Sequence, residues 1–418
     1  MADDFLARDA LVDAVADRTF DRPPALVCNA HVTGLGVARA LAARDVPVVA
    51  VDRTPDGVAP PSDAVALAGR VTYPLDDEAG FRADVERLAA ACGHDPVAFG
   101  CMDEWALAFA RSRPAGVRLP FAADRVDAVL DKTTLYAVAE DLGVPYPETH
   151  RIAETDDRAG ALGRLSADEA ANRLGFPLVV KPARKRRFEE AVGTNVIEVT
   201  DREEYADVVA AAREHDVRVM AQERVETTTG GDRSYGSYVP PAGDPLGVVG
   251  APTRYPRGYG TSCLVERVDD PVVARRARTV LAETGYHGIS EAEFVHDAER
   301  DEHVLLDVNT RPWKWIGLPV AAGADLPGAA YADAVGEAYD LEPTRDPTWV
   351  YLRDYLALLA REGRAVDRLT ESEWTALVAG AFTEDPTLVT GVYRPDDPGP
   401  TRRLLADEFG DRDYYCAC

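Results

Sequence analysis

Apolar runs and helical stretches alternate along the first part of the chain. Strand-like segments occur at 25–30 (ALVCNA), 46–52 (VPVVAVD) and 96–101 (PVAFGC), and the helical stretch VARALAARD lies between the first two. Strands that are apolar throughout and separated by helices predict a parallel sheet covered on both faces. We therefore predict a Rossmann-like α/β domain over residues 1–125.

The pattern changes after this domain. DKTTLYAVAEDLG at 131–143 predicts a helix closed by Gly143, and strands alternate with helices over 166–225. From residue 234 short strands dominate, and GISEAEFVHD and HVLLDVNTR (288–311) flank a polar loop. This succession predicts an antiparallel sheet carrying helices, which is an α+β arrangement.

The charge balance is strongly acidic, with a formal net charge of −26 over 418 residues. A hydrophobic fraction of 46% indicates a globular chain. Because the sequence contains no extended basic face, we do not expect nucleic acid as a partner. No apolar run approaches the roughly 20 residues of a membrane-spanning helix, and the N-terminus lacks the order of a signal peptide, so we expect a cytoplasmic protein. The acid-rich, lysine-poor composition resembles that of halophilic archaeal proteins.

Lysine is rare, because only four of the 46 basic residues are lysines. Two of them, Lys181 and Lys185, lie within five positions in FPLVVKPARKRRF. In a chain that uses arginine almost everywhere else, this pair indicates a need for a compact ammonium that a guanidinium does not meet.

A glycine pair after the first strand has two interpretations. Gly34 and Gly36 in HVTGLG, with Asp52 ending the next strand, fit a tight turn whose amides meet a dinucleotide phosphate. Arg39 stands where that fingerprint needs a third small residue, so a structural turn is about as well supported. The first interpretation implies a nicotinamide-dependent oxidoreductase.

HVLLDVNTRP carries polar side chains at alternate positions. Asp307, Asn309 and Arg311 are expected on one face of a strand, together with Leu305. Glu293 on the preceding strand would lie beside Asp307 if the polar loop between them makes a hairpin. Two carboxylates and an amide carbonyl suit Mg²⁺, with Mn²⁺ as a substitute, whereas a solvated strand face with an ion pair is the simpler alternative.

Taken in order, these motifs make the chain resemble the ATP-grasp ligases. The resemblance covers residues 25–340 and rests on the lysine of DKTTLYAVAEDLG, on FPLVVKP, on VMAQERV, and on Glu-Phe followed by Asp-x-Asn-x-Arg. Within that superfamily the chain is most similar to predicted carboxylate-amine ligases that include D-aspartate ligase, through TGLGVARALAARDVPVVAVD, GCMDEW and GADLP.

The resemblance implies a two-lobed ATP-grasp module behind the Rossmann-like domain. Its small lobe with the hinge strand would span 126–225, its large lobe with the metal site 226–340, and a mixed helix and loop extension 341–418. Two departures from the family pattern stand out. Asp307 replaces the usual Glu, and the glycine-rich phosphate loop is represented only by ARKRRFEEAVGTN, with Gly193.

The resemblance also implies roles around ATP. Lys132 and Lys181 would contact the phosphates, Lys181 also taking part in catalysis, while Glu293, Asp307 and Asn309 would hold Mg²⁺ against them. The hinge main chain would bind adenine, and one of two acids would reach the ribose. The hinge residues are Gln222, Glu223, Arg224 and Val225, and the acids are Glu226 and Asp232.

Other residues would act at the substrates. Arg311 would stabilise the phosphoryl group in transit. Arg254 or Arg257 in APTRYPRGYG could clamp a substrate carboxylate, although a solvated charge is at least as well supported. Asp103 and Glu104, at the carboxyl edge of the first sheet, would either receive an amine or cap the next helix.

The function predicted from these motifs is an ATP-dependent carboxylate-amine ligase. It would form an amide through an acyl phosphate and release ADP and phosphate. Its partners would be a small carboxylate and a small amine, with a homodimer as one option. Two alternatives stay open: the oxidoreductase that uses the Gly34–Gly36 turn, and a non-catalytic nucleotide-binding protein with the ATP-grasp fold.

Overall fold

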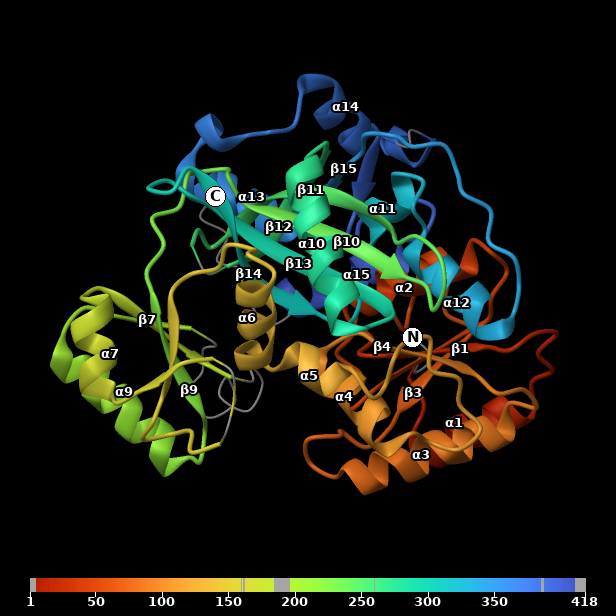
Figure 1. Ribbon diagram of the computed structural model, residues 1–418. Coiled ribbons are helices and arrows are strands. Elements are labelled where there is room, and N and C mark those ends of the chain that lie inside the picture. The colour runs from red at the N-terminus through yellow and green to blue at the C-terminus, as the bar shows by residue number, and fades with distance from the viewer. Residues whose placement is uncertain are drawn as a thin grey trace.

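Figure 1 shows the computed structural model of the chain. The structure describes residues 5–158, 160, 162–183, 196–258, 260–384 and 387–409. Within these ranges the strands form three sheets, of four, five and seven strands. No helix in the described part is long and apolar enough to cross a membrane.

The four-stranded leading sheet is parallel and has the strand order β3-β2-β1-β4. Its strands are β1 (Ala25–Cys28), β2 (Val48–Asp52), β3 (Leu67–Arg70) and β4 (Val97–Gly100). Every residue of β1, β2 and β4 is buried, as their apolar runs predict. The strand order changes direction between β1 and β4, and Asp103 begins a helix at that carboxyl edge, where such sheets bind ligands.

Helices cover both faces of the leading sheet. One face packs on α1 (Arg8–Ala16), α3 (Glu78–Ala91) and α4 (Asp103–Ser112). The opposite face packs on α2 (Val32–Ala42). Alternate residues of each strand serve the two cores, because successive side chains of a strand point to opposite faces.

The five-stranded sheet forms a small lobe, visible at the lower left of Figure 1. Its order is β6 (Arg164–Leu165), β5 (Thr149–Ile152), β9 (Val219–Glu223), β7 (Leu178–Pro182) and β8 (Ile197–Val199). One face packs on α7 (Ala167–Leu174) and α9 (Arg202–Glu214) in a core of its own. The central strand β9 pairs with β5 on one edge and with β7 on the other.

The seven-stranded sheet forms the large lobe and is antiparallel except at its last pair. Its order is β14 (Glu302–Asn309), β13 (Gly288–Asp297), β10 (Arg233–Val239), β11 (Leu246–Tyr255), β12 (Thr261–Val268), β15 (Thr348–Val350) and β16 (Leu388–Thr390). Helix α10 (Pro271–Thr284) covers one face. Strands β15 and β16 come from the extension predicted at 341–418, so the sheet continues across the expected boundary at residue 340.

The remaining helices connect and cover these sheets. They are α5 (Val126–Leu130), α6 (Lys132–Asp141), α11 (Gly317–Ala321), α12 (Leu326–Val335), α13 (Leu352–Glu362), α14 (Glu371–Ala379) and α15 (Gly399–Phe409), with 3₁₀ turns at Arg364–Val366 and Ala381–Glu384. Helix α6 lies between the small lobe and β14 (Figure 1).

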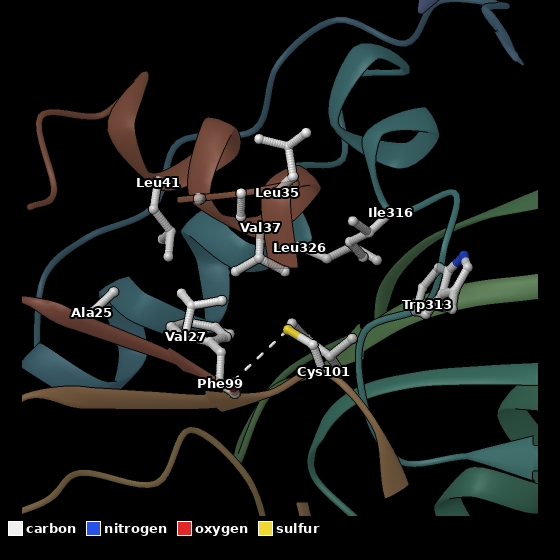
Figure 2. Packing of buried hydrophobic residues seen from close by; sticks show 14 of the residues in the cluster. Ala25, Val27, Leu35, Val37, Leu41, Phe99, Cys101, Trp313, Ile316 and Leu326 are labelled. Atoms are coloured by element: carbon white, nitrogen blue, oxygen red, sulfur yellow. Dashed lines mark hydrogen bonds between the residues drawn. The ribbon is translucent and has the colours of Figure 1, made fainter. Parts of the chain in front are cut away.

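The leading sheet and the large lobe share one core. Leu35 and Val37 of α2 pack beside Ile316 and Leu326, and Trp313 belongs to the same cluster (Figure 2). Residues far apart in the sequence thus bury one another, whereas the core of the small lobe is a separate cluster.

Candidate active site

The hairpin predicted for the metal residues is present. Strands β13 and β14 pair antiparallel, with Glu293 opposite Asp307 and Glu291 opposite Asn309. The Asn309 side-chain amide donates to Glu291 at 3.2 Å and to Glu293 at 2.9 Å. Four oxygen-bearing side chains therefore meet on one face of the hairpin.

A β-bulge separates this polar face from the apolar one. Asp307 pairs with Glu293 but Leu305 pairs with Phe294, so Leu306 is an extra residue in β14. Leu305 is fully buried in the core with Phe294 and Val308. The expectation that Leu305 shares the face of Asp307 is therefore wrong, because simple alternation ignores the bulge.

Two cations bind the carboxylates of the hairpin and of Asp232. The Lys132 ammonium binds the Asp307 carboxylate, and Arg254 donates to Glu293 at 3.0 Å and to Asp232 at 2.9 Å. Burial disfavours the charge of Arg254, but Glu293 and Asp232 outweigh burial and raise its pKa.

Arg311 and Glu291 complete the charged cluster. Arg311 donates to Asp103 of the leading domain, which joins the first sheet to the end of β14. Burial, with Glu293 adding to it, raises the pKa of Glu291 to about 8, although Arg311, Arg254 and Asn309 act in the opposite direction. The buried Glu291 carboxyl is thus harder to ionise than an ordinary glutamate.

The hairpin residues fit a divalent cation in their chemistry. Across the described ranges, no three His, Cys, Asp or Glu side chains stand close enough together to hold a metal ion. The donors are nevertheless all oxygens, which Mg²⁺ prefers, and the hairpin pairing brings them together on one face. Glu293, Asp307 and Asn309 are the residues that would hold it.

The small lobe places Lys181 on the side of α6. Leu178 and Val180 of β7 lie in the lobe's core, so Lys181 points to the opposite face, where it stands opposite Met220. Met220 packs against Tyr136 of α6. Lys181 and Lys132 are therefore on the same side of the sheet.

Two of the four predicted hinge residues, Gln222 and Glu223, have main-chain groups that pair within the sheet. Gln222 lies between Thr149 of β5 and Val179 of β7, and the Glu223 amide donates to the Glu148 carbonyl at 2.9 Å. Arg224 and Val225 follow the end of β9. Arg224 binds Glu198 and Glu226 through its guanidinium.

The other predicted site residues differ in where the structure places them. Arg257 is exposed and binds Glu362 of α13, so the structure brings Arg254 and not Arg257 to the carboxylates. Glu104 is buried and accepts from the Tyr73 hydroxyl at 3.3 Å. Asp103 is the first residue of α4 and not its cap, since Met102 is the N-cap. Lys185 and ARKRRFEEAVGTN beyond its alanine lie outside the described residues.

The glycine pair is not a turn. Gly34 and Gly36 lie inside α2, and a Cβ on Gly36 would meet the Ile316 side chain at 2.6 Å. Asp52 accepts from the Ala30 amide at 2.7 Å and so stabilises the real β1–α2 turn. The turn that the oxidoreductase alternative requires is absent from this described segment, and its glycines serve helix packing instead.

Two residues of the cluster escaped the sequence-based prediction. Glu291 lies two positions before Glu293, so strand alternation from Glu293 would have found it. Tyr136 lies one helical turn after Lys132 and contacts the same strand, β14. A tyrosine in a helix is common in protein cores, so the residue type alone does not indicate a place in the site.

Comparison with known proteins places the fold. No protein-family model matches the chain, and no curated protein is similar to it. N5-carboxyaminoimidazole synthetase from Staphylococcus aureus is similar in structure, with a TM-score of 0.62 and 13% identity over 84% of this chain and 87% of that one. Biotin carboxylase from Campylobacter jejuni has a TM-score of 0.60 and 13% identity, over 80% of this chain and 76% of that one.

An L-amino acid ligase from Bacillus licheniformis is similar as well, with a TM-score of 0.56 and 13% identity over 79% of this chain and 80% of that one. At such identities the likeness concerns the fold. The chain shares a mixed α/β fold, with parallel and antiparallel sheets, with these three proteins.

Proposed function

We propose that this protein is an ATP-dependent carboxylate-amine ligase of the D-aspartate ligase-like group. The observation that carries the proposal is the polar face of the β13–β14 hairpin, with Glu293, Asp307 and Asn309 together and Lys132 bound to Asp307. A structural neighbour, the Staphylococcus aureus synthetase, was also solved as a complex with ADP, which supports a nucleotide at this fold.

The proposed reaction has two steps. The terminal phosphoryl group of ATP moves to a carboxylate oxygen, so that the bond to ADP breaks and an acyl phosphate forms. An amine nitrogen then attacks the acyl carbon, phosphate leaves, and the nitrogen loses a proton. The acyl phosphate makes the second step feasible because phosphate is a far better leaving group than hydroxide.

Each proposed site residue would have a separate role in this reaction. Lys132 and Lys181 bind the phosphates, and Arg311 stabilises the phosphoryl group in transit. Mg²⁺, held by the hairpin carboxylates, would supply charge neutralisation at the triphosphate. Asp103, which binds Arg311 at the edge of the leading sheet, would receive the amine substrate.

The test is a phosphate-release screen of amino acids and small acids at high salt. ADP and phosphate should form only when both a carboxylate and an amine are present. Steady formation of AMP would exclude this mechanism. Binding of ATP with no turnover for any pair would favour the non-catalytic nucleotide-binding alternative.

A further inference from the structure

Helix α6 contacts both lobes of the molecule (Figure 1). Leu135 packs in the core of the large sheet with Phe294, whereas Tyr136 packs with Met220 and Leu162 on the small lobe. Adjacent residues of one helix thus touch different lobes. A side chain here is placed to link them.

The Tyr136 hydroxyl makes that link with two hydrogen bonds. Its side chain is fully buried, and its hydroxyl donates to the Leu306 carbonyl of β14 at 2.8 Å. The same oxygen accepts from the Gln222 side-chain amide of β9 at 3.1 Å. Gln222 is itself held by a 2.7 Å bond to the Thr149 hydroxyl, so its amide is fixed within the small lobe.

The position of Leu306 explains why this contact matters for the site. Leu306 is the bulged residue and has no opposite residue in β13, so its carbonyl is directed to α6 and not to the sheet ladder. The next residue is Asp307, whose carboxylate also accepts from the Val308 amide at 3.0 Å. A bulge aims the side chain beside it, and Tyr136 holds this bulge.

Lys132 acts from the same helix. It precedes Tyr136 by four residues, so the two side chains share one face of α6. Lys132 binds the Asp307 carboxylate while Tyr136 binds the main chain one residue earlier. Helix α6 therefore holds Asp307 at two points.

We propose that Tyr136 is a positioning residue that couples the small lobe to Asp307. Its hydroxyl links Gln222 of strand β9 to the carbonyl of the bulged residue. The bulge in turn orients the Asp307 side chain toward a metal-bound nucleotide. This inference rests on the proposed function only in taking Asp307 as a metal ligand. It does not require that the ligation products be known.

The test measures binding of a non-hydrolysable ATP analogue as a function of Mg²⁺ concentration. Tyr136→Phe removes the hydroxyl and keeps the ring, which stacks on Tyr146 with centroids 5.1 Å apart. The Mg²⁺ concentration for half-maximal binding should rise about tenfold, as for other residues that support a metal ligand. Analogue binding without Mg²⁺ should stay within about twofold of wild type. Tyr146→Phe is the matched control and should change neither value.

A second variant pair shows whether Tyr136 acts through Asp307. In an Asp307→Asn background, Tyr136→Phe should change the Mg²⁺ dependence by less than about twofold, because residues acting through one another are not additive. A full effect in that background would overturn the inference. So would a Tyr136→Phe variant that weakens binding equally with and without Mg²⁺, since that pattern denotes general structural damage.

The two proposals fail separately. If wild type binds the analogue with Mg²⁺ but forms no product, the ligase proposal fails, and the variants still decide the role of Tyr136. If wild type forms product and Tyr136→Phe binds the analogue as wild type does, only the role of Tyr136 fails. Wild type that shows no Mg²⁺-dependent binding overturns both.

Discussion

At the scale of residues, lysine occurs where space is limited. The Lys132 side chain is only 5% exposed and that of Lys314 21% exposed. The Lys314 ammonium fits between the Thr261 hydroxyl at 3.1 Å, the Asp354 carboxylate, and the Tyr351 ring, whose centroid is 4.2 Å away. A compact ammonium suits such places better than a planar guanidinium. In an arginine-rich chain, Lys132 and Lys314 therefore occupy positions where shape as well as charge matters.

Lys181 allows this idea to be tested. It is half-buried at the end of β7 on the side of α6, so an arginine there should displace the phosphate contact that we propose. Lys181→Arg should weaken ATP binding at least tenfold, about 1.4 kcal/mol or more. Titration of ATP at fixed salt measures this.

Lys185→Arg is the comparison for Lys181, with the same exchange four positions later. We expect its ATP affinity to be close to wild type. Equal tolerance at both positions would show that the lysine at 181 is not kept for a phosphate.

At the scale of elements, the β13–β14 hairpin shows how far the sequence leads. Alternation of Asp307 and Asn309 and the loop after Glu293 predicted the pairing, because these are local signals. The bulge at Leu306 was not predicted from the alternation, and its carbonyl accepts from a tyrosine of α6 that is 170 residues away in the chain. Gln222 was placed in the correct strand, and its side chain donates to the Tyr136 hydroxyl, a contact that the sequence did not predict.

The hairpin carries a prediction about the metal. Asp307→Asn and Glu293→Gln each remove one anionic ligand and keep the shape, so Mg²⁺-dependent turnover should fall about a hundredfold, equivalent to about 2.7 kcal/mol. The unfolding temperature should change little by comparison. Steady-state assays over a range of Mg²⁺ concentration would check the loss.

Glu302→Gln offers a control within the same strand. Glu302 begins β14 and binds Arg276 at 2.9 Å, away from the polar face of the hairpin. Its turnover should remain near wild type. Near-normal turnover of the Asp307 or Glu293 variant at ordinary Mg²⁺ would contradict the assignment of these residues to a metal.

Helix α2 carries a prediction about packing. Gly36→Ala would place a methyl group 2.6 Å from the Ile316 side chain, and such overpacking costs about 1–3 kcal/mol. Gly317→Ala, where the nearest atom is 3.5 Å away, should cost little. Chemical unfolding of both variants measures the difference. ATP binding should survive in Gly36→Ala, and a selective loss of nucleotide binding without loss of stability would revive the dinucleotide interpretation of this segment.

At the scale of the whole molecule, the predicted boundaries differ from the way the chain packs. The division at residue 340 followed the end of the family resemblance, yet β15 pairs with β12 and continues the large sheet to β16. Arg39 looked like a defect in a glycine fingerprint, but it binds Asp397 at 2.9 Å and so ties α2 to the C-terminal segment. Contacts between such distant residues leave no local pattern, so only the structure reveals them.

The acidic surface leads to a prediction about salt. A net charge of −26 makes the folded state repel itself, and salt weakens this repulsion as the Debye length falls from about 10 Å at 0.1 M to about 3 Å at 1 M. We expect the unfolding temperature to rise over this range of KCl and then to level off. Sucrose of equal osmotic strength separates the causes, because it stabilises by exclusion from the surface and does not screen charge. A temperature that stays constant in KCl, or one that rises no more in KCl than in sucrose, would show that repulsion among the acidic residues does not limit the stability of this fold.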